Sequence, residues 1–329
     1  MTSWWILHVA SCFVLTTSMT ACGTGERQAG AEVAGGERPV RVIDLTQKLT
    51  AFRPSPSAAA DKRFAADLTT PVGASRVVAA FTDQMVLVQN ADFPTGDGLF
   101  KLNTTVLPEN IGTSMDTSGH FVPTRPEVSN PERRGLADLT VEDLTGPVVF
   151  IDISARVDAE LKKNNGAPGS PQVTNFGNAS ANVVTAADID AVATQLRDRS
   201  FVIVHTGWSR FYSTSGPGLE GPYVNGFNYP GVSREAIARL IDVETSRSIK
   251  INGIGVDNLT VDAGENAGAP KFGPGAFPAH VRGLQRGWKL LENLTNTAEL
   301  GKGPCKLFVG AMNHIGGVAS WARIFASCG

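Results

Sequence analysis

Residues 110–121 of the chain read NIGTSMDTSGHF, and this short stretch combines an aspartate, a histidine, two glycines and several hydroxyl side chains. Carboxylate and imidazole groups are common metal ligands, and glycine permits the tight turns that bring such groups together. A single aspartate or histidine in a loop is more often a hydrogen-bonding residue than a ligand. The stretch therefore raises three possibilities: a ligand-binding turn, a metal site, or what remains of one.

The composition around this stretch is that of an ordinary globular protein. The chain has 329 residues, of which 42% are hydrophobic and 18% charged, and its formal net charge is −2. This length predicts one or two domains and leaves room for a large core. The basic and acidic residues are mixed along the chain without a basic stripe, so nucleic-acid binding is not expected.

The first residues are set apart from the rest. Residues 1–22 contain no aspartate, glutamate, lysine or arginine. This stretch is short for a membrane span and is typical of a secretory signal. Its end, Met19-Thr20-Ala21-Cys22, resembles a bacterial lipoprotein signal. We expect a signal peptide over 1–21, a lipid on Cys22 and a flexible tether over 22–40. The alternatives are a plain cleaved signal and a buried N-terminal helix.

Between residues 41 and 329 we expect a single domain in which strands alternate with a few helices. The capping residues Thr185 and Ser233 predict helices over 189–199 and 234–243, and a third amphipathic segment covers 279–287. Apolar, β-branched runs predict strands over 41–46, 76–81, 85–90, 146–154, 200–208, 249–257, 305–311 and 320–326. Residues 52–76 and 161–180 are expected to be irregular. The predicted class is α/β.

Several of these segments together resemble one family. They are VIDLT, FVIVHTGW, YPGVSREAIARLI, INGIGVDNLTVD, AHVRGLQRGWKLLENLTN and HIGGVASWARIFA, and their order spans the chain from Arg41 onward. The chain is similar to the cyclase family that includes bacterial kynurenine formamidase and isatin hydrolase. The resemblance implies a kynurenine formamidase-like (swivelling β/β/α) domain with a mixed sheet or barrel core and flanking helices.

The same resemblance assigns roles within residues 110–121. The family pattern is H-x-G-T-H-x-D-x-P-x-H-F, whose two early histidines and aspartate bind metal and whose last histidine is the general base. The implied ligands of one zinc or manganese ion are Asp116, His280 and Glu292, with His120 as base. Asn110 and Ser114 stand where the family has its first two histidines, and these side chains are poorer ligands. We expect them to make substrate contacts or weak metal contacts.

The function implied by the resemblance is that of an exported, metal-dependent hydrolase. Its substrate would be a small amide, formamide or cyclic amide or lactone, as for arylformamidases, which act in tryptophan catabolism, and isatin hydrolases. The alternative is an exported small-molecule-binding pseudoenzyme on the same scaffold. We expect a membrane-anchored lipoprotein or a secreted or periplasmic protein, with membrane contact only through the anchor. Relatives imply a homodimer or a larger homo-oligomer.

Four further residues have two interpretations each. His205 and Trp208 lie in the last part of a predicted strand and would either line the pocket or pack in the structure. Cys305 opens one strand and Cys328 closes the next, and the two strands are expected to pair around Gly316 and Gly317. If the strands are antiparallel, the two cysteines face each other, and an oxidising compartment would favour a disulfide. Two free thiols are the alternative, because directly opposed cysteines often fit disulfide geometry poorly.

Overall fold

The computed structural model describes residues 40–52, 84–93, 100–121, 134–163, 182–212, 223–225, 228–264 and 277–329. The predicted signal peptide, the lipidation of Cys22 and the tether up to residue 39 lie outside these ranges, as do the strand predicted at 76–81 and most of the predicted loop at 161–180. No helix within the described ranges has the length and apolar character needed to cross a membrane.

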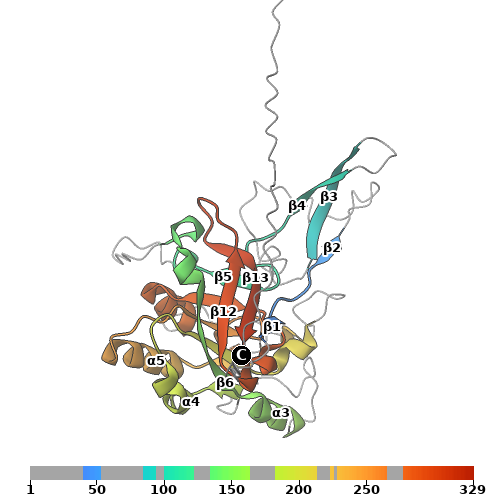
Figure 1. Ribbon diagram of the computed structural model, residues 1–329. Helices are drawn as coiled ribbons and strands as arrows, with labels where there is room; N and C mark the ends of the chain where they lie inside the picture. Colours follow the sequence, from blue (N-terminus) through green and yellow to red (C-terminus); the bar gives the residue numbers. More distant parts are fainter. Residues whose placement is uncertain are drawn as a thin grey trace, which may run out of the picture. The chain divides into compact units, whose positions relative to one another are not determined.

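The described part of the chain is an α/β domain (Figure 1). Three α-helices are present in it: α3 (Ser154–Lys163), α4 (Ala186–Val192) and α5 (Arg234–Ser246). The strands are β1 (Arg41–Asp44), β2 (Thr50–Phe52), β3 (Gln84–Phe93), β4 (Phe100–Val106), β5 (Ser114–Asp116), β6 (Thr145–Asp152), β7 (Val183–Val184), β8 (Phe201–His205), β9 (Gly231–Val232), β10 (Gly253–Val256), β11 (Lys289–Glu292), β12 (Cys305–Ala311) and β13 (Ala319–Cys328).

The main sheet closes on itself. Its described strands follow the order β1-β13-β12-β6-β8-β10-β11-β5. Strand β5 also pairs with β13, which closes the strands from β13 to β5 into a barrel, and β1 pairs with another part of β13. Strands β6, β8, β10 and β11 run parallel, whereas β12, β13 and β5 join them by antiparallel pairing. In Figure 1, β12 and β13 lie side by side. The predicted α/β domain with a mixed barrel core is confirmed.

Alternating side chains of the parallel strands form two cores. In β8, Val202 and Val204 belong to one apolar cluster, which also contains Ile189 of α4 and Leu240 of α5. Phe201 and Ile203 of the same strand belong to the other cluster. Because successive strand residues point to opposite faces, each central strand is buried on both sides. This explains why the parallel strands appear in the sequence as continuous apolar runs.

The helix starts follow the predicted capping residues. Thr185 Oγ1 accepts the backbone N–H of Asp188 at the start of α4, and Ser233 Oγ accepts the N–H of Ala236 at the start of α5. These bonds satisfy N–H groups that have no partner inside the helix. The segment that follows Pro278 is helical as expected, with a π-helical turn over Ala279–Gly283 and a 3₁₀ turn over Leu284–Arg286.

Several boundaries differ from the prediction. Helix α4 ends at Val192 rather than at 199, and β10 covers only 253–256 of the expected 249–257. Helix α3 was not predicted, and it extends into residues 161–163, which were expected to be a loop. Its apolar stripe has only Val157 and Leu161 buried, so its sequence gives a weak amphipathic signal.

Candidate functional site

Strands β5 and β11 place two carboxylates on the same face of the sheet. Asp116 lies opposite Leu290 in the antiparallel register, and Glu292 lies opposite Ser114. Side chains two residues apart on a strand share a face, so Ser114, Asp116, Leu290 and Glu292 point to the same side. Asp116 is fully buried and Glu292 is 7% exposed. Two buried carboxylates therefore lie diagonally across one strand pair.

The helical segment after Pro278 brings an imidazole to these carboxylates. His280 Nε2 lies 3.4 Å from Asp116 Oδ2 and 3.6 Å from Glu292 Oε1. The other ring nitrogen, Nδ1, lies 2.6 Å from Asp262 Oδ2. The three residues that the resemblance implied as ligands thus meet at one point, although two of them lie far from Asp116 in the sequence.

His120 stands at the edge of this cluster. Its Nε2 lies 3.9 Å from Asp116 Oδ2, and its side chain is 28% exposed. One ligand atom from each of Asp116, His120 and His280 lies within 4.8 Å of the others, a spacing that a single metal ion can bridge. His120 is therefore close enough to act at the same centre, and it is the most exposed member of the group.

Asn110 and Ser114 occupy the positions of the two missing histidines. The Asn110 amide donates a hydrogen bond to Asp116 Oδ1 at 2.6 Å, so it holds one carboxylate oxygen in place. Ser114 is fully buried, and its Oγ has no hydrogen-bond partner among the described residues. The same holds for Asp116 Oδ2. The cluster therefore contains two buried oxygens that the described protein atoms leave unsatisfied.

The electrostatics reflect the crowding of carboxylates in a dry site. Burial, the largest influence, and the neighbouring Asp116 carboxylate raise the pKa of Glu292 to about 8. Burial alone would lower the pKa of His280, but the close Asp116 carboxylate, the hydrogen bond to Asp262 and the nearby negative charges raise that pKa well above the ordinary value. The protein thus gathers negative charge that a cation, or a proton, has to neutralise.

Two aromatic rings flank the His280 imidazole. The Phe121 ring lies 5.3 Å from it in an edge-on arrangement, and the Phe277 ring lies 6.0 Å from it. The two phenylalanine rings are 5.9 Å from each other. These contacts restrict the imidazole from its sides and give the site an apolar wall.

His205 lies on the other side of the sheet. Val204 belongs to the same buried cluster as Leu290, which shares a face of β11 with Glu292, so His205 at the next position of β8 points away from the carboxylate cluster. Its Nδ1 lies 2.8 Å from Thr297 Oγ1 and 3.1 Å from Asp257 Oδ2. The structure thus places His205 in a separate polar network rather than beside the carboxylate cluster.

Trp208 is a core residue. Its side chain is fully buried in the helix-side cluster, and its indole N–H donates to the Tyr223 carbonyl at 2.8 Å. Of its two interpretations, the structure favours packing. A tryptophan after a strand has the same sequence signal in either role, so the residue type alone could not decide.

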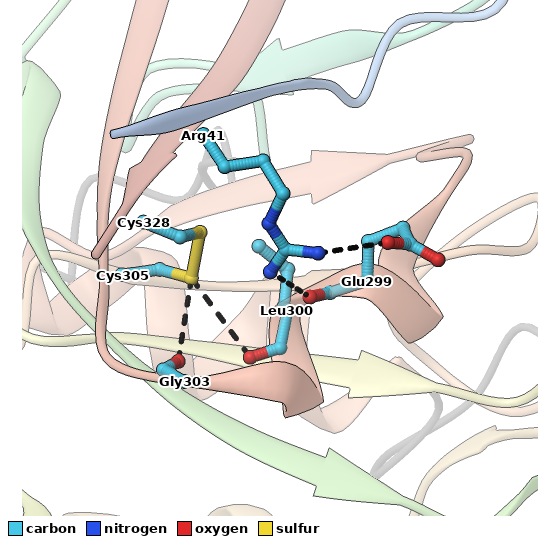
Figure 2. The surroundings of a disulfide bond; sticks show 6 residues. All are labelled: Arg41, Glu299, Leu300, Gly303, Cys305 and Cys328. Atoms are coloured by element: carbon cyan, nitrogen blue, oxygen red, sulfur yellow. Dashed lines mark hydrogen bonds and ion pairs between the residues drawn. A yellow bond between two sulfur atoms is a disulfide. The ribbon is translucent and has the colours of Figure 1, made fainter. Parts of the chain in front are cut away.

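Figure 2 shows the disulfide between Cys305 and Cys328. The two residues are direct partners in the antiparallel register of β12 and β13, and their Cα atoms are 4.1 Å apart. Arg41, at the start of β1, pairs with Cys328 on the other edge of β13, and its guanidinium donates to Glu299 Oε2 at 2.9 Å. The disulfide and this ion pair fix the end of the chain to the barrel.

Asp262 is the residue of the cluster for which the sequence analysis predicted no role. It is 2% exposed and holds the His280 ring, yet in the sequence it is an ordinary acidic residue within INGIGVDNLTVD. Its position shortly after the end of β10 is the one available signal, because polar groups at the carboxyl ends of parallel strands often line functional sites.

Comparison with protein families gives one match, the family named Cyclase and described as "Putative cyclase", over residues 43–263. This range includes Asp116, His120 and Asp262. A search of curated proteins finds no match.

Among solved structures, several isatin hydrolases share the fold. One, bound to the product analogue thioisatinate, is 23% identical with a TM-score of 0.58, and the alignment covers 88% of this chain and 92% of that one. Isatin hydrolase A from Ralstonia solanacearum is 20% identical with a TM-score of 0.60 and coverages of 88% and 92%. The enzyme from Labrenzia aggregata, bound to benzyl benzoate, is 22% identical with a TM-score of 0.59 and coverages of 88% and 94%.

Proposed function

The chain belongs to the Cyclase family, and from this premise we propose that it is a metal-dependent hydrolase of a small amide, formamide or cyclic amide or lactone. The observation that supports this most directly is the buried Asp116 Oδ2, which has no hydrogen-bond partner among the described residues and faces His280 Nε2 at 3.4 Å. A buried carboxylate oxygen left unpaired costs free energy unless a cation or a proton occupies the space before it.

The residues present fit a divalent ion. Asp116, His280 and Glu292 supply two carboxylates and an imidazole, a donor set that suits zinc or manganese. The raised pKa of Glu292, about 8 in the absence of a cation, reflects burial and the repulsion from Asp116 that a cation between the groups would offset. When bound, the ion would polarise the carbonyl of the substrate and make water a better nucleophile.

The chain's own residues would divide the remaining work. His120, the exposed imidazole of the cluster, would accept the proton of the attacking water. Asn110 would hold Asp116 by its Oδ1, leaving Oδ2 directed into the site. The rings of Phe121 and Phe277 would exclude water from the sides of His280. A fixed, partly dry site of this kind favours hydrolysis because its charges need little rearrangement during the reaction.

Metal analysis and activity assays test the proposal together. The protein, purified without chelator, should contain about one zinc or manganese per chain and hydrolyse N-formylkynurenine or isatin in a chelator-sensitive manner. Asp116→Asn should lose the metal, whereas Asp152→Asn, which changes an exposed strand-end carboxylate, should keep it. A protein that stays metal-free after supplementation with both ions would contradict the proposal.

A second candidate is a binding protein that has lost catalysis. It is favoured by one observation: Asn110 and Ser114 replace imidazoles, and the amide nitrogen of Asn110 bonds to Asp116. Such a protein would bind a small amide or lactone without turnover. Calorimetric binding of isatin in the absence of hydrolysis, by protein that has been loaded with zinc, would support this candidate against the hydrolase.

We also propose that the protein is exported. The charge-free residues 1–22 ending in Cys22 support this, since they have the composition of a signal. The pairing of Cys305 with Cys328 is compatible with an oxidising compartment. Expression of the full chain in a bacterial host, followed by fractionation and labelling with a fatty acid, tests both export and lipidation. Replacement of Cys22 by serine should remove the label, and cytoplasmic, unlabelled protein would contradict the proposal.

A further inference from the structure

Asp262 makes three hydrogen bonds to one short segment. Its Oδ1 accepts the backbone N–H of Ala279 at 2.6 Å, and its Oδ2 accepts the backbone N–H of His280 at 3.2 Å. The same Oδ2 lies 2.6 Å from His280 Nδ1, which donates to it. One buried carboxylate therefore fixes both the backbone and the imidazole of His280.

The segment that it holds begins with a strained residue. Phe277 has a φ of 52°, in the left-handed region that bulky side chains rarely adopt, and it precedes Pro278. A conformation of this kind persists only where surrounding contacts enforce it. The carboxylate of Asp262 accepts hydrogen bonds from the backbone N–H groups of Ala279 and His280. These bonds can therefore hold the backbone of this segment in its strained conformation.

The bond to Nδ1 determines where the other ring nitrogen points. With Nδ1–H donated to Asp262, Nε2 lies on the opposite side of the ring and faces Asp116 Oδ2 and Glu292 Oε1. The rings of Phe121 and Phe277 lie against the imidazole. Rotation of the ring would thus break the bond to Asp262 and also disturb these contacts.

Asp262 is itself held by a close backbone contact. It forms a parallel bridge with Val232, and the residue before that valine is Gly231. A Cβ added at Gly231 would lie 2.5 Å from the Ala263 backbone, so a larger residue does not fit there without movement. The backbone at Asp262 is therefore held by the contact with Val232 and Gly231, and its carboxylate is held by the hydrogen bonds to Ala279 and His280.

We propose that Asp262 is a positioning residue that acts through His280: it fixes the imidazole so that Nε2 is presented to the site formed by Asp116 and Glu292. It touches neither the substrate nor the ion in this role. Carboxylates that accept the second N–H of a ligating histidine orient the ring and raise its basicity, and their loss commonly weakens metal binding by about 10–100-fold. The hydrogen-bonding role stands on the geometry alone, whereas its effect on metal binding rests on the proposed function.

The test compares two aspartates that both bond to backbone N–H groups at a helix start. In Asp262→Ala the His280 ring loses its acceptor, and zinc binding, measured by competition with a chromogenic chelator, should weaken by about 10–100-fold. Asp188→Ala removes bonds to Thr185 at the start of α4 and the ion pair with Arg156, where no imidazole is involved, and should leave the zinc affinity unchanged. If Asp262 were merely structural, Asp262→Ala would lower the unfolding temperature but leave the zinc affinity of the folded protein intact. That outcome would overturn the proposal.

A second measurement does not depend on the metal or on the folding of a variant. The chain has 5 histidines, so ¹⁵N-histidine labelling gives a simple imidazole spectrum of the unaltered, metal-free protein. His280, assigned with His280→Gln, should show a slowly exchanging Nδ1–H proton. A rapidly exchanging Nδ1 proton would overturn the positioning role. If this proton is protected but the unaltered protein binds no zinc, the positioning role stands and the proposed function fails.

Discussion

His280 Nε2 lies 3.4 Å from Asp116 Oδ2, a fully buried carboxylate oxygen that has no hydrogen-bond partner among the described residues. The two residues come from different parts of the chain, one from a three-residue strand and the other from a π-helical turn. Their meeting point, with Glu292 beside it, is the centre on which the proposed hydrolysis depends.

His120→Ala should reduce turnover by about 10²–10⁴-fold while leaving the metal content nearly unchanged, because a positioned general base contributes a factor of that size. His120 Nε2 is 3.9 Å from Asp116 Oδ2 and the side chain is partly exposed, which suits proton transfer. Steady-state kinetics and metal analysis of the same preparation measure both quantities.

His314→Ala is the matched control for this variant. His314 is 40% exposed and contacts Glu109, outside the proposed machinery, so its loss should leave turnover near the unaltered level. If His120→Ala instead releases the metal, then His120 is a ligand and not the base. This outcome is worth measuring because ligand atoms of Asp116, His120 and His280 lie within 4.8 Å of one another.

Asn110→His combined with Ser114→His should tighten metal binding, because imidazole is a better ligand for zinc than an amide or a hydroxyl. Both positions adjoin Asp116: Asn110 bonds to it directly, and Ser114 shares its face of β5. Calorimetric titration with zinc measures affinity and stoichiometry, and a second ion per chain is a further expected outcome.

Asn110→Leu serves as the comparison, since it removes the bond to Asp116 without adding an imidazole. It should weaken zinc binding or leave it unchanged. If the double histidine variant folds and still matches the unaltered protein in affinity and stoichiometry, these two positions do not face the metal.

The sequence predicted the strands of the barrel core well where burial on both faces produces a continuous apolar run. SFVIVH and GPVVFID are such runs, and they form the adjacent parallel strands β8 and β6. By contrast, closure of the barrel depends on β5, a strand of three residues that pairs with both β11 and β13. Three residues are too few to show a periodicity, so the closure could not be read from the pattern.

The site, like the fold, was predictable from the sequence only in part. Asp116, His120, His280 and Glu292 were inferred from the family resemblance, and the structure brings them together. Asp262 was missed because its contacts with Ala279 and His280 are tertiary hydrogen bonds, which no local pattern specifies. The sequence left His205 with two interpretations, because it does not show on which face of β8 a residue at the end of the strand lies, and one position along a strand reverses the face.

Lys289→Met should change the dependence of stability on pH. Lys289 is 1% exposed and its Nζ lies 3.2 Å from Asp143 Oδ1. Burial, opposed by the Asp143 charge, lowers the pKa of Lys289 from 10.5 to about 8. A group whose pKa is lower in the folded state contributes stability that is full above its unfolded pKa and is lost as the pH falls towards the folded value.

The free energy of unfolding should therefore gain up to about 3 kcal/mol from Lys289 as the pH rises through this window. Urea unfolding at several alkaline pH values measures the slope. Lys289→Met should remove this contribution, whereas Lys306→Met, at an exposed position of β12, should leave it intact. Identical slopes for all three proteins would show that Lys289 does not titrate abnormally.

Removal of the bond between Cys305 and Cys328 should destabilise the protein. The two cysteines are 23 residues apart in the sequence, and a crosslink over a loop of this size contributes about 3 kcal/mol by the chain-entropy relation. Both side chains are buried, so Cys305→Ala with Cys328→Ala keeps the positions apolar and isolates the effect of the crosslink. The double variant should unfold at lower urea concentration, and a reducing agent should shift the unaltered protein in the same direction but not the variant. Mass spectrometry of a non-reduced digest supplies the direct measurement: two freely alkylatable thiols in exported material would mean that the bond does not form in its own compartment.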